Sequence, residues 1–386
     1  MTELQQLINE LCPNGVKFVA LEECCKILDN KRKPVTKAAR QAGEYPYYGA
    51  NGIQDYVSDY IFDGIFVLVG EDGSVVTPSG NPVVNWATGK IWVNNHAHII
   101  EEKDGVLLRY LYHYLQTVNV SALIHGNIPK LTGGDFRAIK VPVPPLPVQS
   151  EIVRILDNFT ELTAELTAEL TARRQQYEYY NNTLLSFDNA KYKTLEELCD
   201  IVDYRGKTPR KVDDGIFLVT AKNIRKGFID YDKSKEYISP EDYDEVMHRG
   251  FPQIGDVLIT TEAPCGNVAQ IDNENIALAQ RVIKYRPKNN NLNSTFLKYV
   301  LLGKEFQDKL ERAATGGTVK GIKGSTLHQL TIPVPSIEEQ ERIVAILERF
   351  DTLCNDISEG LPAEIEARQK QYEYYRDKLL TFEPAK

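Results

Sequence analysis

The most constraining feature of this sequence is an internal repeat that covers the whole chain. The segment ARRQQYEYYNNTLLSF at 172–187 returns as ARQKQYEYYRDKLLTF at 367–382. Upstream, VPVPPLPVQSEIVRILDNF at 141–159 is matched by IPVPSIEEQERIVAILERF at 332–350. The stretches before these motifs have diverged. The sequence therefore predicts two dissimilar globular parts held in one duplicated frame.

The first repeated segment has the pattern of one long helix. Apolar residues recur at three-to-four spacing across 148–187, and Pro145 and Pro147 stand just before it, where a helix can begin. About forty residues that rise about 1.5 Å each make a rod of roughly 60 Å. Within it TAEL occurs twice, at 163–166 and 167–170. Each such tetrad adds roughly 6 Å to the helix.

The second copy predicts a helix that begins at Ser336, whose S-I-E-E sequence matches a capping box. Gly360 and Pro362 predict a kink or a restart within it. We expect the two helical segments to pack on each other, antiparallel if the halves are related by a pseudo-twofold axis, with Tyr177 and Tyr372 in the interface. The alternative is that each helix packs only on its own globular part.

The globular parts read as mixed α+β structure. Runs bounded by Gly, Asp and Asn predict strands within 62–73, 90–100 and 255–272, and periodicity predicts helices within 105–116 and 294–310. The expected division of the chain is a first globular domain at 1–147, a helix at 148–187, a second globular domain at 188–337 and a helix at 338–386.

Composition and motifs exclude several classes of protein. The net charge of −9 argues against nonspecific coating of DNA. The sequence contains no run of eighteen apolar residues, so it predicts no membrane span. We expect the N-terminus not to be a signal peptide, and six Cys without paired spacing indicate reduced thiols in a cytoplasmic protein. Motifs for nucleotide hydrolysis, methyl transfer and nucleophilic hydrolysis are missing. His96 and His98, expected on one face of a strand, lack a third ligand at sensible spacing, so we expect no metal. Because the cofactor motifs are missing, we also expect no cofactor.

Basic residues gather at the same place in both halves. Segment 26–40, just after LEECC (21–25), holds six basic residues and one acidic residue. Segment 204–211, just after LEELC (195–199), holds four basic residues and no acidic residue. A solvated loop is the ordinary explanation of one such run, but the recurrence favours two binding loops.

The repeated helices, the I/V-P-V-P step into a Q-xx-IV-x-IL helix and the TAEL tetrads together resemble one family, the DNA specificity (S) subunits of type I restriction–modification systems. TAEL and QYEYY resemble in particular the subclass whose members carry such tetrads. The resemblance implies two target recognition domains that each read half of a bipartite, asymmetric DNA site, with the helices as a spacer. It also implies two methyltransferase (M) subunits and restriction (R) subunits as partners, which would carry out the catalysis.

Two other readings stay open from the sequence. One is an enzyme acting alone on DNA, such as a methyltransferase or a nuclease, although the motifs for it are absent. The other is a tandem coiled-coil scaffold that binds only proteins.

The resemblance directs attention to side chains that can hold phosphates or read base edges. In the first domain we expect backbone contacts from Lys31, Arg32, Lys33, Lys37 and Arg40, and a reading surface of Tyr47, Tyr48, Asn51, His125, Asn127 and Lys130. In the second domain the matching loop supplies Arg205, Lys207, Arg210 and Lys211, and the set is completed by Lys222, Asn223, Arg225, Lys226, Thr318, Lys320 and Lys323.

Overall fold

The structure, a computed structural model, describes residues 3–386 with the exception of 74, 188–189, 205–208, 317–319 and 357–358. The chain divides into two compact units. The first comprises residues 1–167 and 364–386, and the second comprises residues 168–363. Each unit thus contains one globular part and portions of both helical segments. None of the helices in the described part of the chain could span a bilayer.

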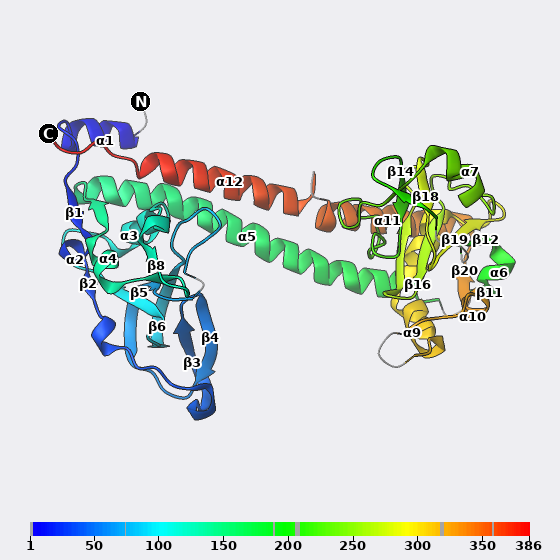
Figure 1. The fold of residues 1–386 in the computed structure, drawn as a ribbon, viewed down its shortest axis with the longest axis horizontal. Helices are drawn as coiled ribbons and strands as arrows, with labels where there is room; N and C mark the ends of the chain where they lie inside the picture. The colour runs from blue at the N-terminus through cyan, green and yellow to red at the C-terminus, as the bar shows by residue number, and fades with distance from the viewer. Residues whose placement is uncertain (1–2, 74, 188–189, 205–208, 317–319, 357–358) are drawn as a thin grey trace. The chain divides into compact units, whose positions relative to one another are not determined.

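The first unit is built on a six-stranded sheet of order β2-β7-β5-β6-β3-β4, in which β3 and β6 run parallel and the other neighbours antiparallel (Figure 1). Its elements before the long helix are α1 (Glu3–Leu11), β1 (Phe18–Ala20), α2 (Leu21–Cys24), β2 (Lys26–Ile27), η1 (Asp29–Lys31), η2 (Lys37–Ala39), β3 (Ala42–Gly49), β4 (Gly52–Val57), β5 (Phe62–Gly70), β6 (Val84–Val93), β7 (Ala97–Glu101), α3 (Leu108–Leu115), η3 (Ser121–Leu123), β8 (Ile124–His125), β9 (Lys130–Leu131), α4 (Gly133–Ala138) and β10 (Lys140–Pro142).

The central strand β5 is buried over its last five residues, because helices cover one face and apolar side chains of the same sheet fill the other. The strand expected within 62–73 is thus confirmed. The run 90–100 is two strands, since it turns at 94–96 between β6 and β7, where the Asn94 side chain accepts a hydrogen bond from the His96 N–H at 2.8 Å. The helix expected within 105–116 is α3.

The second unit holds two four-stranded sheets, of order β12-β19-β16-β17 and β13-β15-β14-β18. Its elements between the long helices are β11 (Lys191–Thr194), α6 (Leu195–Leu198), β12 (Cys199–Asp203), β13 (Lys211–Val212), β14 (Ile216–Val219), β15 (Tyr237–Ile238), η4 (Pro240–Asp242), α7 (Tyr243–Val246), β16 (Val257–Thr261), β17 (Cys265–Gln270), β18 (Ile276–Leu278), β19 (Val282–Pro287), α8 (Ser294–Leu302), α9 (Lys304–Ala313), α10 (Gly324–His328) and β20 (Thr331–Val334).

The run 255–272, which was expected to contain a strand, forms the antiparallel hairpin β16–β17, so this prediction is confirmed. The single helix expected within 294–310 is two helices, because Gly303 adopts an extended conformation and separates α8 from α9. The two units therefore share their motifs but not their sheets, which agrees with the divergence of the sequence between the repeats.

The helical segments follow the predicted pattern closely. Helix α5 runs without interruption over Leu146–Leu184. In the second copy, α11 (Ile337–Asn355) is capped by Ser336, whose side chain accepts a hydrogen bond from the Glu339 N–H at 3.4 Å. The chain restarts as α12 (Leu361–Leu379), so the expected interruption at Gly360 and Pro362 is confirmed.

The same aromatic contact joins the helices in both units. In the first unit Phe159 of α5 stacks on Tyr375 of α12, with ring centroids 5.3 Å apart. In the second unit Phe350 of α11 stacks on Tyr180 of α5 at 5.5 Å. These residues occupy equivalent positions of the repeat. Each unit therefore pairs the first helical motif of its own half with the QYEYY motif of the other half, and within the first unit α5 and α12 run antiparallel (Figure 1).

The first tyrosine of each QYEYY motif packs inward, as expected. Tyr372 is buried, and its hydroxyl lies 3.0 Å from Nδ1 of His113 on α3. Tyr177 packs against the core of the second unit, with its ring 6.0 Å from that of Phe350. These contacts identify the repeated motif as a core element of the unit on which it packs.

Candidate nucleic-acid interface

In the first unit, the basic loop that follows β2 is anchored by Asp29. One carboxylate oxygen of Asp29 lies 2.7 Å from Nδ1 of the buried His98, and the other accepts the Ile99 N–H at 3.0 Å. Nε2 of His98 lies 3.0 Å from the Leu131 carbonyl oxygen. Burial opposes ionisation of Asp29, but the hydrogen bond and charge of His98 outweigh it and lower the pKa of this carboxyl. The loop is thus fixed to β7 and to the end of β9.

Glu71, directly after β5, connects two of the predicted binding segments. It accepts a hydrogen bond from Arg32 at 2.5 Å, and its other oxygen lies 3.1 Å from Nζ of Lys130. Arg32 also donates to the Ala97 carbonyl at 2.7 Å. Partial burial opposes ionisation of Glu71, but the hydrogen bond from Arg32 and the nearby positive charges lower the pKa of its carboxyl. Arg32 and Lys130, far apart in sequence, therefore share one counterion.

The potential metal-binding atoms of Asp29, Glu71 and His98 all lie within 4.8 Å of one another. Arg32 and Lys130 already pair with these carboxylates, so the cluster is a partly buried ion network with its own cations. The expectation that His96 shares a strand face with His98 is wrong, because His96 stands in the turn before β7 and pairs with Asp72.

The next part of the loop is tied to the sheet by aromatic residues. The Tyr47 hydroxyl accepts the Val35 N–H at 3.0 Å, and the Trp92 indole donates to the Lys33 carbonyl at 2.6 Å. The Arg40 guanidinium lies 4.1 Å from the centre of the Tyr47 ring and donates to Asp55 at 3.2 Å. These contacts preorganise the loop while its lysines remain exposed.

The candidates of the first unit thus fall into two groups. Tyr47 and Tyr48 are buried and serve the core, and Arg32 and Arg40 are largely occupied within the protein. The exposed members are Lys31, Lys33, Lys37, Asn51 at the tip of β3–β4, and His125, Asn127 and Lys130 on the β8–β9 hairpin. Lys31, Lys33 and Lys37 form no ion pair with any described residue.

In the second unit, Arg205, Lys207 and Thr318 lie outside the described residues. Arg210 is exposed, and Lys211 at the start of β13 pairs with Glu236 at 2.7 Å. Asn223 is fully buried, where its side chain accepts from Thr220 and donates to the carbonyls of Asp230 and Ser234. It shapes the 220–234 loop, which exposes Lys222 and Lys226.

A groove in the second unit brings together two of the predicted basic residues. Lys226 and Lys320 both line a cavity of about 930 Å³, whose wall also includes Pro264 at the β16–β17 tip. Lys320 pairs with the exposed Glu311 at 2.6 Å, and Lys323 is exposed at the start of α10. Lys320, just before α10, and the 220–234 loop therefore border one cavity.

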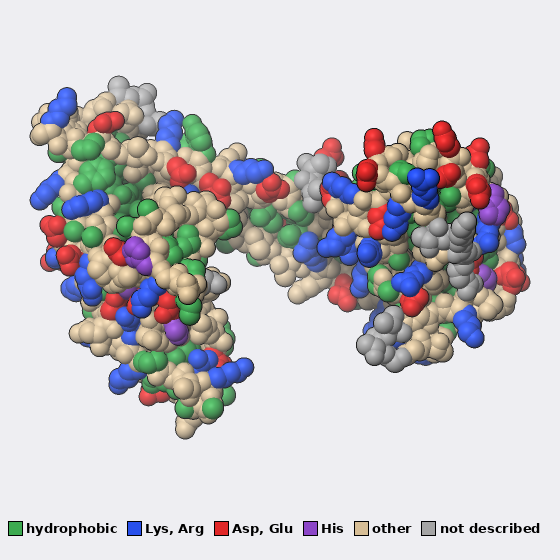
Figure 2. All heavy atoms as spheres, viewed as in Figure 1, with side chains coloured by type: hydrophobic (Ala, Val, Ile, Leu, Met, Phe, Trp, Pro, Cys, Tyr) green, Lys and Arg blue, Asp and Glu red, His purple; other side chains and the backbone are tan. Residues whose placement is uncertain are grey.

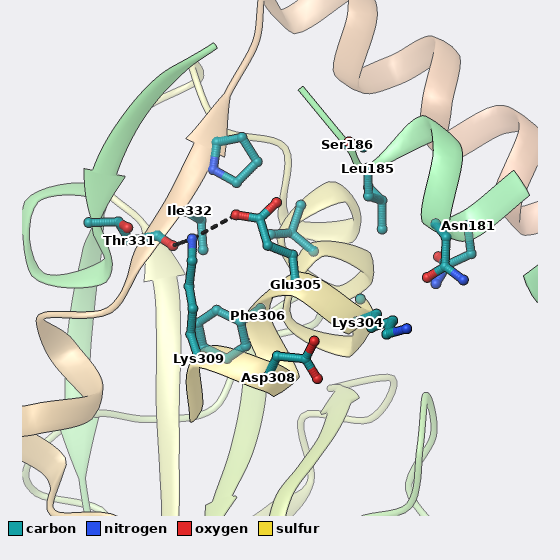
Figure 3. A pocket seen from close by; sticks show the side chains of 14 residues that line it. Asn181, Leu185, Ser186, Lys304, Glu305, Phe306, Asp308, Lys309, Thr331 and Ile332 are labelled. Carbon is teal, nitrogen blue, oxygen red and sulfur yellow. Dashed lines mark hydrogen bonds and ion pairs between the residues drawn. The ribbon is translucent and has the colours of Figure 1, made fainter. Parts of the chain in front are cut away.

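A second cavity of about 390 Å³ lies between the end of α5, helix α9 and β20 (Figure 3). Lys309 spans it, pairing with Glu305 at 2.7 Å and donating to the Thr331 carbonyl at 3.2 Å. The bond from Lys309 to the Thr331 carbonyl holds α9 against β20. Figure 2 shows basic and acidic side chains intermixed on the visible face of each unit.

Sequence reasoning missed a buried charged cluster in the second unit. Asp256 and Lys284 are both buried and lie 3.2 Å apart, and Arg286 donates two hydrogen bonds to Asp256 at 2.6 and 2.7 Å. Burial lowers the pKa of Lys284, and the charge of Asp256 offsets part of that effect. Only the G-D-V-L-I sequence at 255–259 hinted at an acid that enters a buried strand.

The comparisons with known proteins agree with this architecture. The family model of the type I restriction modification DNA specificity domain matches residues 13–173 and again residues 188–367. The chain therefore belongs to the family of type I restriction–modification specificity subunits. Its function is DNA sequence recognition in such a system, and it is not the catalytic component.

Two relatives illustrate the similarity. The putative type I restriction enzyme specificity subunit S.HindORF215P of Haemophilus influenzae is 38% identical over 95% of this chain and 96% of its own. The type I restriction enzyme EcoR124I/EcoR124II specificity subunit of Escherichia coli is 38% identical over 73% of this chain and 72% of its own. The crystal structure of an S subunit from M. genitalium shares the fold, with a TM-score of 0.59 at 15% identity over 95% of this chain and 96% of that one.

Proposed function

We propose that the two units read the two halves of one bipartite, asymmetric DNA site. The observation that supports this most is the combination of a duplicated helical frame with two globular parts whose sheets differ, each of which carries its own basic loops. Different surfaces read different sequences, so the two half-sites differ. The four segments 1–147, 148–187, 188–337 and 338–386 act in this proposal as reader, spacer, reader and spacer.

The exposed members of the candidate set carry the contacts in this proposal. Lysines of the 29–40 loop bind phosphates, and the β3–β4 and β8–β9 hairpin tips present Asn51, His125 and Asn127 to base edges. The exposed candidates of the second unit, which take the same role there, are Arg210, Lys222, Lys226, Lys320 and Lys323. The buried Tyr47, Tyr48 and Asn223 act indirectly by shaping the loops.

Exchange of residues 20–140 for the module of another family member tests the assignment of the units. Sequencing of methylated DNA should then show one changed half-site and one unchanged half-site. A change in both halves would contradict independent reading.

Helix α5 acts in this proposal as the spacer, and the chain belongs to the subclass with tetrad repeats. The two TAEL units occupy 163–170 within the uninterrupted helix. One additional TAEL lengthens a helix by about 6 Å, which is between one and two base-pair rises of about 3.4 Å. Insertion of one tetrad should therefore keep both half-sites and lengthen the spacer between them. Methylation mapping that finds the original spacer would refute the spacer role.

The partners in this proposal are two methyltransferase subunits, with restriction subunits added in the full complex, and they act on DNA in the cytoplasm. Tyr179 and Tyr374 occupy equivalent repeat positions and are 64% and 60% exposed. Each packs edge-on against the next tyrosine, at 5.6 and 5.3 Å. Exposed aromatic residues are typical of protein interfaces, and twin surfaces suit two copies of one partner.

Native mass spectrometry can count these partners. Tyr374→Ser should reduce the number of bound methyltransferase subunits from two to one, and Tyr179→Ser should do the same. Retention of two subunits in the double variant would contradict this surface. If the chain bound only proteins, the assembled complex would show no sequence-selective, salt-sensitive DNA binding.

A further inference from the structure

Arg281, in the second unit, has an uncommon backbone conformation at an exposed position. Its φ is +69°, and among the described residues other than glycine only Ala263 shares a positive φ. Residues other than glycine rarely adopt this backbone region, and such outliers gather at functional sites. The side chain of Arg281 is 55% exposed, so its conformation does not serve core packing.

Two strands hold this backbone in place. Thr260 pairs with Val282 at the end of the β16–β19 ladder, and just beyond that pair the Thr261 N–H donates to the Arg281 carbonyl at 2.9 Å. The Thr261 hydroxyl donates to the same carbonyl at 3.3 Å. Thr261 is itself buried. The Arg281 side chain therefore leaves the sheet edge from a fixed base.

The guanidinium of Arg281 meets Glu262 at the β16–β17 tip, with Nε 3.3 Å from Oε2. Glu262 also forms a bridge with Gly321, and the Ile322 N–H donates to the Thr261 carbonyl at 3.0 Å. The pair thus borders the loop that carries Lys320. Exposed ion pairs contribute little to stability, so folding gives no reason for a strained arginine here.

We propose that Arg281 and Glu262 together read one guanine–cytosine base pair in the half-site bound by the second unit. Arginine donates two hydrogen bonds to O6 and N7 of guanine, and a carboxylate accepts from N4 of cytosine, both in the major groove. The pair offers these two complementary groups side by side. The neighbouring lysines supply phosphate contacts. This inference rests on the proposed function and adds a base identity to it.

The test maps methylation in cells that carry the complete restriction–modification system with a variant of this chain. Arg281→Gly removes the side chain and suits the left-handed backbone, so it should not weaken folding. The half-site read by the second unit is the one that exchange of residues 20–140 leaves unchanged. In the wild type, this half-site should contain a guanine–cytosine pair. Arg281→Gly should make that one position degenerate, with discrimination reduced about ten- to a hundredfold. Lys235→Ala, which breaks the exposed pair with Asp232, is the matched control and should leave the motif intact.

The possible outcomes distinguish failure of the base-pair assignment from failure of the proposed function. A wild-type site that is not bipartite overturns the proposed function, and this inference with it. A bipartite site whose second half is unchanged in Arg281→Gly overturns the inference alone. If Arg281→Gly instead loses affinity equally for all DNA sequences, and the slope of log K against log salt concentration is smaller by about one, Arg281 contacts a phosphate and the inference is also overturned.

Discussion

Replacement of Asp256 by Asn would test the buried charged cluster of the second unit. The change removes the carboxylate that Lys284 and Arg286 share, and Lys284 is only 3% exposed. Removing one partner of a buried pair costs about 3–5 kcal/mol, because the remaining charge stays desolvated. With an m-value of about 2 kcal/mol/M, the urea midpoint of the second unit should fall by about 2 M.

Two probes distinguish the units in this experiment. Both tryptophans, Trp86 and Trp92, lie in the first unit, so their fluorescence follows that unit. Circular dichroism follows both units and should show the shifted transition. Asp232→Asn, which breaks the exposed pair with Lys235, is the control and should change the free energy of unfolding by less than about 1 kcal/mol.

The double variant Asp256→Asn/Lys284→Met provides the decisive comparison. Since it removes both buried charges, it should recover more than half of the lost stability. In Asp256→Asn alone, the pKa of Lys284 is further depressed, so the unfolded state binds more protons and stability should rise with pH up to about 10.4. A double variant no more stable than Asp256→Asn, or a single variant without this pH dependence, would refute the reasoning.

Three further predictions follow from the first unit and the helices. Glu71→Gln removes the negative charge that Arg32 and Lys130 share, so methylation assays should show poorer recognition of the half-site read by the first unit and unchanged recognition of the other half-site. Burial lowers the pKa of His113 despite its contact with Asp157, so the unfolded state takes up the proton first; chemical denaturation should show stability lost as pH falls below about 6.5, and His113→Phe should remove this part of the acid sensitivity. Phe350→Ala removes the half-buried stacking partner of the QYEYY motif and should lower the free energy of unfolding by about 1–3 kcal/mol; an unchanged thermal midpoint would contradict the packing described for α11.

The helical frame could be predicted from the sequence because its signals are local. A continuous apolar stripe predicted α5 within a few residues of its ends, and Ser336 and the Gly360–Pro362 segment marked where a helix begins and restarts. The break at Gly303 was missed, since glycine is tolerated within a helix and only packing decides its conformation there.

The charged clusters could not be predicted because their partners are distant in sequence. Glu71 meets Arg32 and Lys130 only after β5 and the β8–β9 hairpin are in place. Periodicity likewise says nothing of the left-handed backbone at Arg281. Asn223 resembled a reading residue because it stands among basic residues, although its amide is buried and satisfied by the backbone of its own loop.

The equivalent stacks of Phe159 on Tyr375 and Phe350 on Tyr180 bear on how such chains can change. Both contacts are made by residues of the repeated segments, and neither involves the diverged sheets. A genetic crossover within these segments would therefore replace an entire reading module while it preserved both of these aromatic stacks. New combinations of half-sites could arise in a single recombination event, without a period of compensating mutation.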